Sequence, residues 1–181
     1  MRVISGALRG KKLREPTGMD VRPTTDMVKE SIFNIIQFDI EGRRALDLFS
    51  GTGQIGIEAL SRGAASVVFV DAAKDSIALT RENIKLAGVE DAATVVQSDA
   101  MSYLARGERF DLIFLDPPYD SPFLERSLEK IIEFDILKEH GIIICETRAD
   151  RKTPEVSAPL VPMREYRYGK VKLALFGRSE E

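Results

Sequence analysis

Short apolar runs alternate with amphipathic stretches along most of the chain. The apolar runs have the length of strands and cover residues 45–49, 66–70, 93–97, 110–115 and 142–145. Between them, apolar residues recur at helical spacing over 54–61, 73–87, a short stretch after Asp99, and 122–134. The runs at 110–115 and 142–145 are almost wholly apolar, as expected of strands buried on both faces. Alternation at this spacing predicts βαβ units and a parallel sheet.

The beginning of the chain departs from this alternation. Residues 1–24 mix basic and apolar residues with several glycines and a proline, which predicts a short hairpin or arm. Thr24, Thr25 and Asp26 then offer an N-cap to a helix that we expect to run to about Phe38.

The end of the chain departs from it as well. Segments 163–168 and 171–176 flank Gly169 and Lys170 and predict an antiparallel hairpin. We therefore predict an α/β fold with a doubly wound, Rossmann-like, mostly parallel sheet of seven strands that this hairpin closes. The expected organisation is an arm of residues 1–24 followed by a single domain of residues 25–181.

Composition narrows the function classes. A chain of 181 residues corresponds to about one domain. One cysteine and one histidine exclude a disulfide framework and a Cys/His zinc site, and we expect no metal. The sequence lacks an apolar run of the roughly 20 residues that a membrane span needs. It also starts without the apolar stretch of a secretory signal, so we expect a cytoplasmic protein.

Charge is unevenly distributed along the chain. Residues 1–22 carry six basic and two acidic side chains, a net charge of +4 within a chain whose formal net charge is −3. We name four of the basic residues the basic quartet: Arg9, Lys11, Lys12 and Arg14. A basic segment on a mildly acidic body is typical of a protein that contacts a polyanion along one edge, and we expect the quartet to bind RNA phosphates. A merely solvated arm stays open as the alternative.

A glycine-rich segment follows the first strand of the predicted sheet. Gly51, Gly53 and Gly56 form a G-x-G-x-x-G pattern where the strand turns into a helix, and glycines there allow a ligand close approach to the backbone. Asp71 ends the second strand, where an acid can accept hydrogen bonds from ribose hydroxyls. The pattern alone permits a dinucleotide such as NAD. Asp47 argues against it, because a carboxylate beside the glycines would oppose a pyrophosphate and suit a ligand with an amino group.

A third acid follows the third strand at the same edge. Asp99 could bind the amino group of an adenine, or it could cap the short helix that begins at Ala100. Both roles stay open from the residues alone. Acids around a glycine loop fit S-adenosylmethionine better than a dinucleotide.

The segment Asp116-Pro117-Pro118-Tyr119 ends the fourth strand, at the edge where open α/β sheets bind ligands. Two prolines fix the backbone and leave carbonyl oxygens in a stiff turn. Such acceptors suit the exocyclic amine of a nucleobase, whose N–H groups they can hold. The aromatic ring could stack on the base, which must leave its helix or loop to be reached.

The segment DPPY at 116–119, with DLFSGTG at 47–53, resembles the amino-group N-methyltransferases that use S-adenosylmethionine. The segments ISGALRGKKL at 4–13 and VRPTTDMVKESIFNI at 21–35 extend the likeness to the bacterial 16S ribosomal RNA guanine-N2 methyltransferases of the RsmD type. This resemblance covers almost the whole chain. It implies methyl transfer to the N2 amine of a guanine in 16S ribosomal RNA, either free or in the assembling small ribosomal subunit.

The resemblance also assigns roles to matching positions. The amine-binding and stacking residues would be Asp116, Pro117, Pro118 and Tyr119. The residues implied to surround the cofactor would be Arg22, Thr24, Asp47, Phe49, Gly51, Gly53, Asp71, Ala72, Asp99 and Ala100. Two other functions stay open: an adenine-N6 methyltransferase on DNA or RNA, since DPPY serves adenine too, and a non-catalytic nucleotide-binding module.

Overall fold

The computed structural model describes residues 1–18 and 24–180 and forms one seven-stranded sheet with helices on both faces. The strands are β1 (Arg44–Leu48), β2 (Ser66–Asp71), β3 (Ala93–Gln97), β4 (Phe110–Leu115), β5 (Leu137–Arg148), β6 (Leu160–Tyr168) and β7 (Val171–Arg178). The helices are α1 (Asp26–Ile35), α2 (Gln54–Ser61), α3 (Lys74–Ala87), α4 (Ala100–Leu104) and α5 (Phe123–Glu133), with a 3₁₀ turn at Glu90–Ala92.

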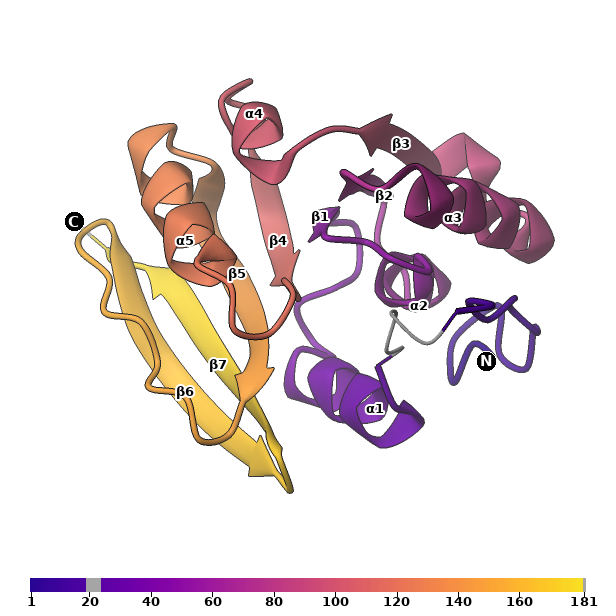
Figure 1. Cartoon of the computed structure of the whole chain (residues 1–181), viewed down its shortest axis with the longest axis horizontal. Coiled ribbons are helices and arrows are strands. Elements are labelled where there is room, and N and C mark those ends of the chain that lie inside the picture. The colour runs from indigo at the N-terminus through magenta and orange to yellow at the C-terminus, as the bar shows by residue number, and fades with distance from the viewer. Residues whose placement is uncertain (19–23, 181) are drawn as a thin grey trace.

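The strand order is β3-β2-β1-β4-β5-β7-β6, and Figure 1 shows the sheet running from the β6–β7 hairpin at one edge to β3 at the other. Strands β1 to β5 pair in parallel, whereas β7 pairs antiparallel with both β5 and β6. The doubly wound, mostly parallel sheet with a closing hairpin is therefore confirmed. The order reverses between β1 and β4, and a ligand crevice is expected outside the carboxyl ends of strands at such a switch point.

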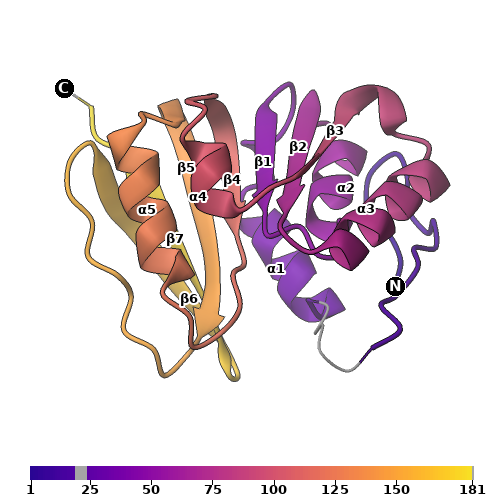
Figure 2. The same cartoon turned by 45° about the horizontal axis from the view of Figure 1, so that its top comes forward.

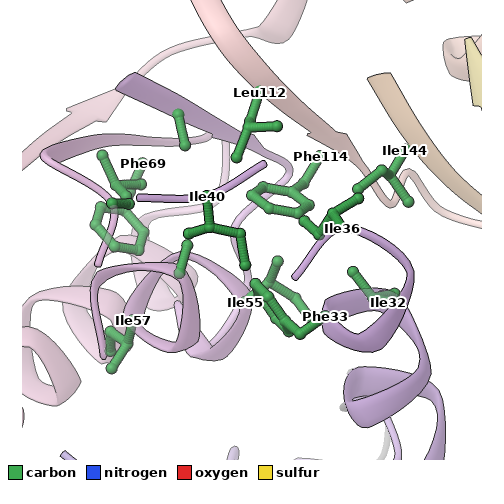
Figure 3. Close-up of a cluster of buried hydrophobic side chains, with 14 of the residues drawn as sticks. Ile32, Phe33, Ile36, Ile40, Ile55, Ile57, Phe69, Leu112, Phe114 and Ile144 are labelled. Atoms are coloured by element: carbon green, nitrogen blue, oxygen red, sulfur yellow. The ribbon is translucent and has the colours of Figure 1, made fainter. Parts of the chain in front are cut away.

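Apolar side chains fill the space on each side of the sheet. One cluster joins α1, α2 and α3 to residues such as Phe69 of β2 and Phe114 of β4, and Figure 3 shows how Phe33 and Ile36 pack under Phe114. The rings of Phe33 and Phe114 lie 5.8 Å apart at a tilt of 48°. A second cluster joins α4 and α5 to the opposite face of the sheet. Burial on both faces explains the continuous apolar runs of β4 and β5.

The arm folds back onto α2 and α3, where Figures 1 and 2 place the N-terminus. An antiparallel bridge joins Arg2 to Lys12, and the residues that follow each of them, Val3 and Leu13, are buried. Their burial is matched by polar contacts, because Glu58 of α2 accepts hydrogen bonds from the backbone N–H groups of Ile4 and Ser5. The first thirteen residues thus turn back on themselves and are fixed to the body of the protein.

Element ends differ from the expectations by a few residues. Helix α1 ends at Ile35, three residues before the expected end, with Ile36 outside helical geometry. Strand β5 begins at Leu137 because that residue pairs with Phe110 ahead of an irregularity in the register, and it extends to Arg148 by pairing with β7. These extensions rest on partners from distant segments, which local periodicity does not reveal.

Candidate active site

A cavity of about 1160 Å³ opens at the carboxyl ends of β1 and β4. The glycine loop, the acids that end the first strands and the DPPY segment all line it. Typical sites for a single small ligand have volumes of roughly 300–1000 Å³. The cavity is therefore large enough for a nucleotide-sized cofactor and part of a second substrate.

The turn from β1 to α2 needs glycine at particular points. Gly51 and Gly53 have φ angles of +55° and +81°, in the left-handed region. A Cβ on Gly56 would lie 2.3 Å from the ring of Phe69, so the third glycine allows α2 to pack closely on the sheet. Phe49 adopts a φ of +69° without being glycine, and its ring packs 5.9 Å from that of Phe123. Strained backbone of this kind is concentrated at binding sites.

Asp47 is buried beneath this loop, with 3% of its surface exposed. One of its carboxyl oxygens accepts the N–H of Gly56 at 3.0 Å, which satisfies a donor in the first turn of α2. Burial raises the pKa of Asp47 to about 8. The hydrogen bond from Gly56 works against this rise, and the charge of Asp71 adds to it. A buried acid on the wall of a cavity favours a cationic ligand group, since such a group lowers the cost of ionisation.

The remaining predicted cofactor residues of the described chain line the same cavity, apart from Gly53, which lies directly after the lining residues Gly51 and Thr52. Asp71 accepts hydrogen bonds from the backbone N–H groups of Gly51 and Ala73, at 3.0 and 2.9 Å. It therefore holds the glycine loop against the end of β2. Arg22 lies outside the described residues.

Asp99 is the N-cap of α4, as one of its two open roles predicts. Its side chain accepts hydrogen bonds from the backbone of Met101 and Ser102 and from the hydroxyl of Ser102. The bonds from Ser102 hold the pKa of Asp99 below its usual range. The carboxylate and Ala100 also border the cavity, so adenine binding there stays a prediction.

The donor set fits S-adenosylmethionine. A buried carboxyl at Asp47 suits an ammonium group, and the acid at Asp71 suits ribose hydroxyls. A Cβ added to Gly51 would have no other atom within 4 Å, so the backbone of the loop is open to a ligand at this point. When bound, this cofactor supplies a methyl group activated by its positively charged sulfur.

The DPPY segment forms another part of the cavity wall, besides the glycine loop. Pro117 is buried, whereas Tyr119 is 37% exposed and can present its ring to a substrate. The hydroxyl of Ser121 donates to the carbonyl of Pro118 at 2.6 Å, which stiffens the turn. Asp116 stands at the end of β4, and β4 pairs directly with β1. The structure thus brings the four DPPY residues to the same cavity as the glycine loop.

Glu146 of β5 belongs to this site, and the sequence interpretation missed it. The residue is 9% exposed and lines the cavity beside Asp116. The hydroxyl of Thr24 lies between the two acids, 3.4 Å from Asp116 Oδ2 and 3.3 Å from Glu146 Oε2. The available signal was an acid ending the apolar run GIIICE, at the sheet edge where Asp116 also stands.

The two neighbouring carboxyls perturb one another. Burial first, and then the charges of Glu146 and Asp47, raise the pKa of Asp116 well above its usual value. Burial also raises the pKa of Glu146, but hydrogen bonds from Thr24, Asp116 and Tyr119 oppose that rise. Burial therefore favours a proton held within this pair, and the hydrogen bonds to Glu146 oppose its protonation.

A buried chain of hydrogen bonds links the site to the arm. The carbonyl of Thr24 accepts from Gln54 Nε2, and Gln54 Oε1 accepts from Lys29 Nζ at 3.1 Å. Lys29 also donates to the carbonyl of Arg2 at 2.8 Å. The arm therefore helps to hold Thr24 in place on the wall of the cavity.

The basic quartet lies outside the cavity, on the side of α3. Arg14 pairs with Glu82 at 2.9 Å, and Lys11 Nζ donates to the carbonyl of Ala87 at 3.2 Å. Lys12 borders a shallower hollow of about 510 Å³ that reaches Thr24. Two basic residues that the sequence interpretation did not select, Arg148 and Lys170, line the mouth of the cavity itself.

No helix of residues 1–18 and 24–180 is long and apolar enough to cross a membrane. The same residues contain no group of three or more His, Cys, Asp or Glu side chains that could hold a metal ion.

Known proteins resemble the chain over its whole length. The model of a family described as Conserved hypothetical protein 95 matches residues 1–177. A Bacillus subtilis protein, provisionally named rRNA methyltransferase YlbH, is 42% identical over 97% of this chain and 98% of its own length. Ribosomal RNA small subunit methyltransferase D of Escherichia coli K12 is 34% identical, over 100% of this chain and 91% of that protein. The solved structure of yhhF from Escherichia coli superposes with a TM-score of 0.90 at 34% identity, covering 100% of this chain and 99% of that one.

Proposed function

The chain belongs to the family described as Conserved hypothetical protein 95, and from that premise we propose that it methylates small-subunit ribosomal RNA. The methyl donor is S-adenosylmethionine. We propose further that the acceptor is the exocyclic N2 amine of a guanine. The relatives' names give the RNA but not the base, so the base is argued from the site.

The observation that carries the proposal is the shared cavity of the glycine loop and Asp116. The two segments end adjacent parallel strands, so a donor on the loop and an amine on the DPPY turn meet at the switch point. An exocyclic amine is a weak nucleophile because its lone pair is delocalised into the ring. Asp116 and the carbonyl of Pro117 hold its N–H groups and direct the lone pair toward the methyl carbon.

In the chemical step the carboxyl pair takes up the proton that the amine loses. S-adenosylmethionine held by the glycine loop and Asp47 would supply the methyl carbon that the N2 lone pair attacks, with its sulfur as the leaving group. N2 then carries a positive charge and loses one proton to the anionic pair of Asp116 and Glu146. The negative charge of that pair, in a site of low polarity, stabilises the cation that develops on the base.

Guanine is favoured over adenine by the hydrogen-bonding character of the site. Asp116 and Glu146 present acceptors, and the edge of guanine that carries N2 also carries the N1–H donor. Beside its N6 amine, adenine presents an N1 acceptor that a carboxylate would repel. The two acids therefore support the choice of guanine.

Basic residues on two sides of the cavity suit an RNA backbone. Lys170 and Arg148 line the cavity, Arg148 being paired with Asp120 and Asp150, and the basic quartet lies separately on the arm. Phosphate contacts of this kind position a substrate without reading its sequence. The target base must leave its stack to reach Asp116, and Tyr119 is placed to stack on it.

An in vitro assay tests the proposal. Purified protein, labelled S-adenosylmethionine and ribosomal RNA from a strain lacking this gene are incubated, and the RNA is digested to nucleosides. We expect label in N2-methylguanosine. Label in N6-methyladenosine would overturn the choice of base, and cofactor binding without transfer to any RNA would favour a non-catalytic module.

A further inference from the structure

Glu146 belongs neither to the DPPY segment nor to the glycine loop, yet it lines the cavity between them. Its carboxyl lines the cavity next to Asp116, and both acids lie within 3.4 Å of the one hydroxyl of Thr24. A hydroxyl has a single proton and can serve one acceptor at a time. The pair therefore keeps acceptor capacity directed toward the cavity after its contacts within the protein are made.

An ionised carboxylate has about four acceptor sites. The hydroxyl of Thr24 donates to Glu146, and hydrogen bonds from Asp116 and Tyr119 also act on its carboxyl group. Because Glu146 is almost completely buried, any acceptor site that its neighbours leave unmatched is costly. A donor on the substrate, next to the amine that Asp116 holds, would satisfy it.

We propose that Glu146 selects the base: its carboxylate accepts the N1–H of the guanine whose N2 amine is held by Asp116. This inference rests on the proposed function and adds a residue that chooses between bases. A base with a bare ring nitrogen at N1 places a lone pair against the carboxylate and is rejected. Adenine is rejected for the same reason.

A purely structural role for Glu146 would be to fix Thr24 and the start of α1. Loss of that role would slow methylation of every base by the same factor. Base selection predicts a change in the ratio between two bases instead. The test therefore measures the ratio of the methylation rates of two bases, in wild type and in variants.

The probe is 2-aminopurine, which keeps the 2-amino group and carries a bare N1 where guanine has N1–H. The modified nucleotide is first mapped in wild-type reactions. RNA substrates with guanine or 2-aminopurine at that position are then compared, using wild type, Glu146→Gln and the control Glu155→Gln. Glu155 is 90% exposed and pairs with Lys152 on the surface.

For wild type we expect kcat/KM to favour guanine by about 10- to 100-fold, the range for one well-placed base contact. In Glu146→Gln the side-chain amide can donate to the bare N1, so the preference should fall about tenfold or more. Glu155→Gln should keep the wild-type preference. A readout without turnover is the fluorescence of 2-aminopurine, which rises when the base unstacks, and Glu146→Gln should increase that rise relative to wild type.

An unchanged preference in a folded, cofactor-binding Glu146→Gln would overturn the inference. If that variant does not fold, the wild-type comparison decides alone, because rates within about twofold for the two bases contradict the proposal. A wild-type enzyme that forms no N2-methylguanosine would instead overturn the proposed function.

Discussion

The buried carboxyl of Asp47 predicts that affinity for S-adenosylmethionine rises with pH below about pH 8. In the free protein, burial raises the pKa of Asp47 to about 8, so the acid is mostly protonated at neutral pH. If this carboxylate holds the ammonium group of the cofactor, only the ionised form is competent to bind. At any pH below about 8, binding must therefore first remove a proton from Asp47, and this cost lowers the affinity.

The expected magnitude follows from the ionised fraction, about 1% at pH 6 and about 9% at pH 7 for a pKa of about 8. Apparent affinity scales with the competent fraction, so it should rise about eight- to tenfold over this unit of pH. The amino group of the cofactor, with a pKa of roughly 7.7–8.0, stays mostly charged in that range. Above about pH 8 it loses its charge, and the affinity should level off and fall.

Calorimetric titration across this range measures the dependence directly. Asp47→Asn should bind more weakly and show a nearly flat profile. The exposed Asp75→Asn, on the first turn of α3 and outside the cavity, should keep the wild-type profile. A flat wild-type profile between about pH 6 and pH 7 would refute the assignment of Asp47 to the ammonium group.

The same raised pKa predicts a gain in stability for the variant. An acid whose pKa is higher in the folded state stabilises the fold at low pH, and this contribution is lost as the pH rises from about 4 to about 8. Ligand-free Asp47→Asn should therefore melt above wild type at pH 8, measured by calorimetry. A lower melting temperature there would mean that the bond to Gly56 outweighs the burial of charge.

Three further predictions concern other parts of the site and the arm. Asp116→Ala should lower methyl transfer on the order of 10²-fold or more while calorimetry finds cofactor binding largely intact, and an active variant would remove this residue from the mechanism. Neutralising the basic quartet should weaken RNA binding and leave cofactor affinity unchanged. The slope of log K for RNA against log salt concentration should become shallower by up to roughly 0.7 for each lost phosphate contact. Unchanged RNA affinity at low salt would mean that the arm is only solvated. Glu58→Ala should lower the free energy of unfolding by about 3–5 kcal/mol in a denaturant titration. The substitution leaves the N–H groups of Ile4 and Ser5 without their acceptor and the charge of Arg62 without its partner. A decrease below about 1 kcal/mol would contradict that role.

Most of the fold could be predicted because its signals are local. Strands buried on both faces give continuous apolar runs such as 110–115, and the glycine pattern at 51–56 marks the turn between β1 and α2. The acids and glycines of the cavity were predictable for the same reason, since they lie at or just after the ends of parallel strands, whereas Thr24 and Phe49 were assigned by the family resemblance.

Glu146 and the position of the arm could not be predicted in this way. Glu146 reaches Asp116 because β5 lies next to β4, a long-range pairing that periodicity does not encode. The arm docks through Glu58 and Asn83, two buried polar side chains on helices whose sequence pattern shows only amphipathicity. Buried polar contacts of this kind depend on tertiary packing and leave no periodic signal.

The most direct test of the central claim is nucleoside analysis of 16S ribosomal RNA from cells. RNA is compared between a strain lacking this gene and the same strain supplied with wild type or with Asp116→Ala. We predict that N2-methylguanosine at one position is missing without the gene, returns with wild type and does not return with the variant. An unchanged N2-methylguanosine content in the strain lacking the gene would contradict the account.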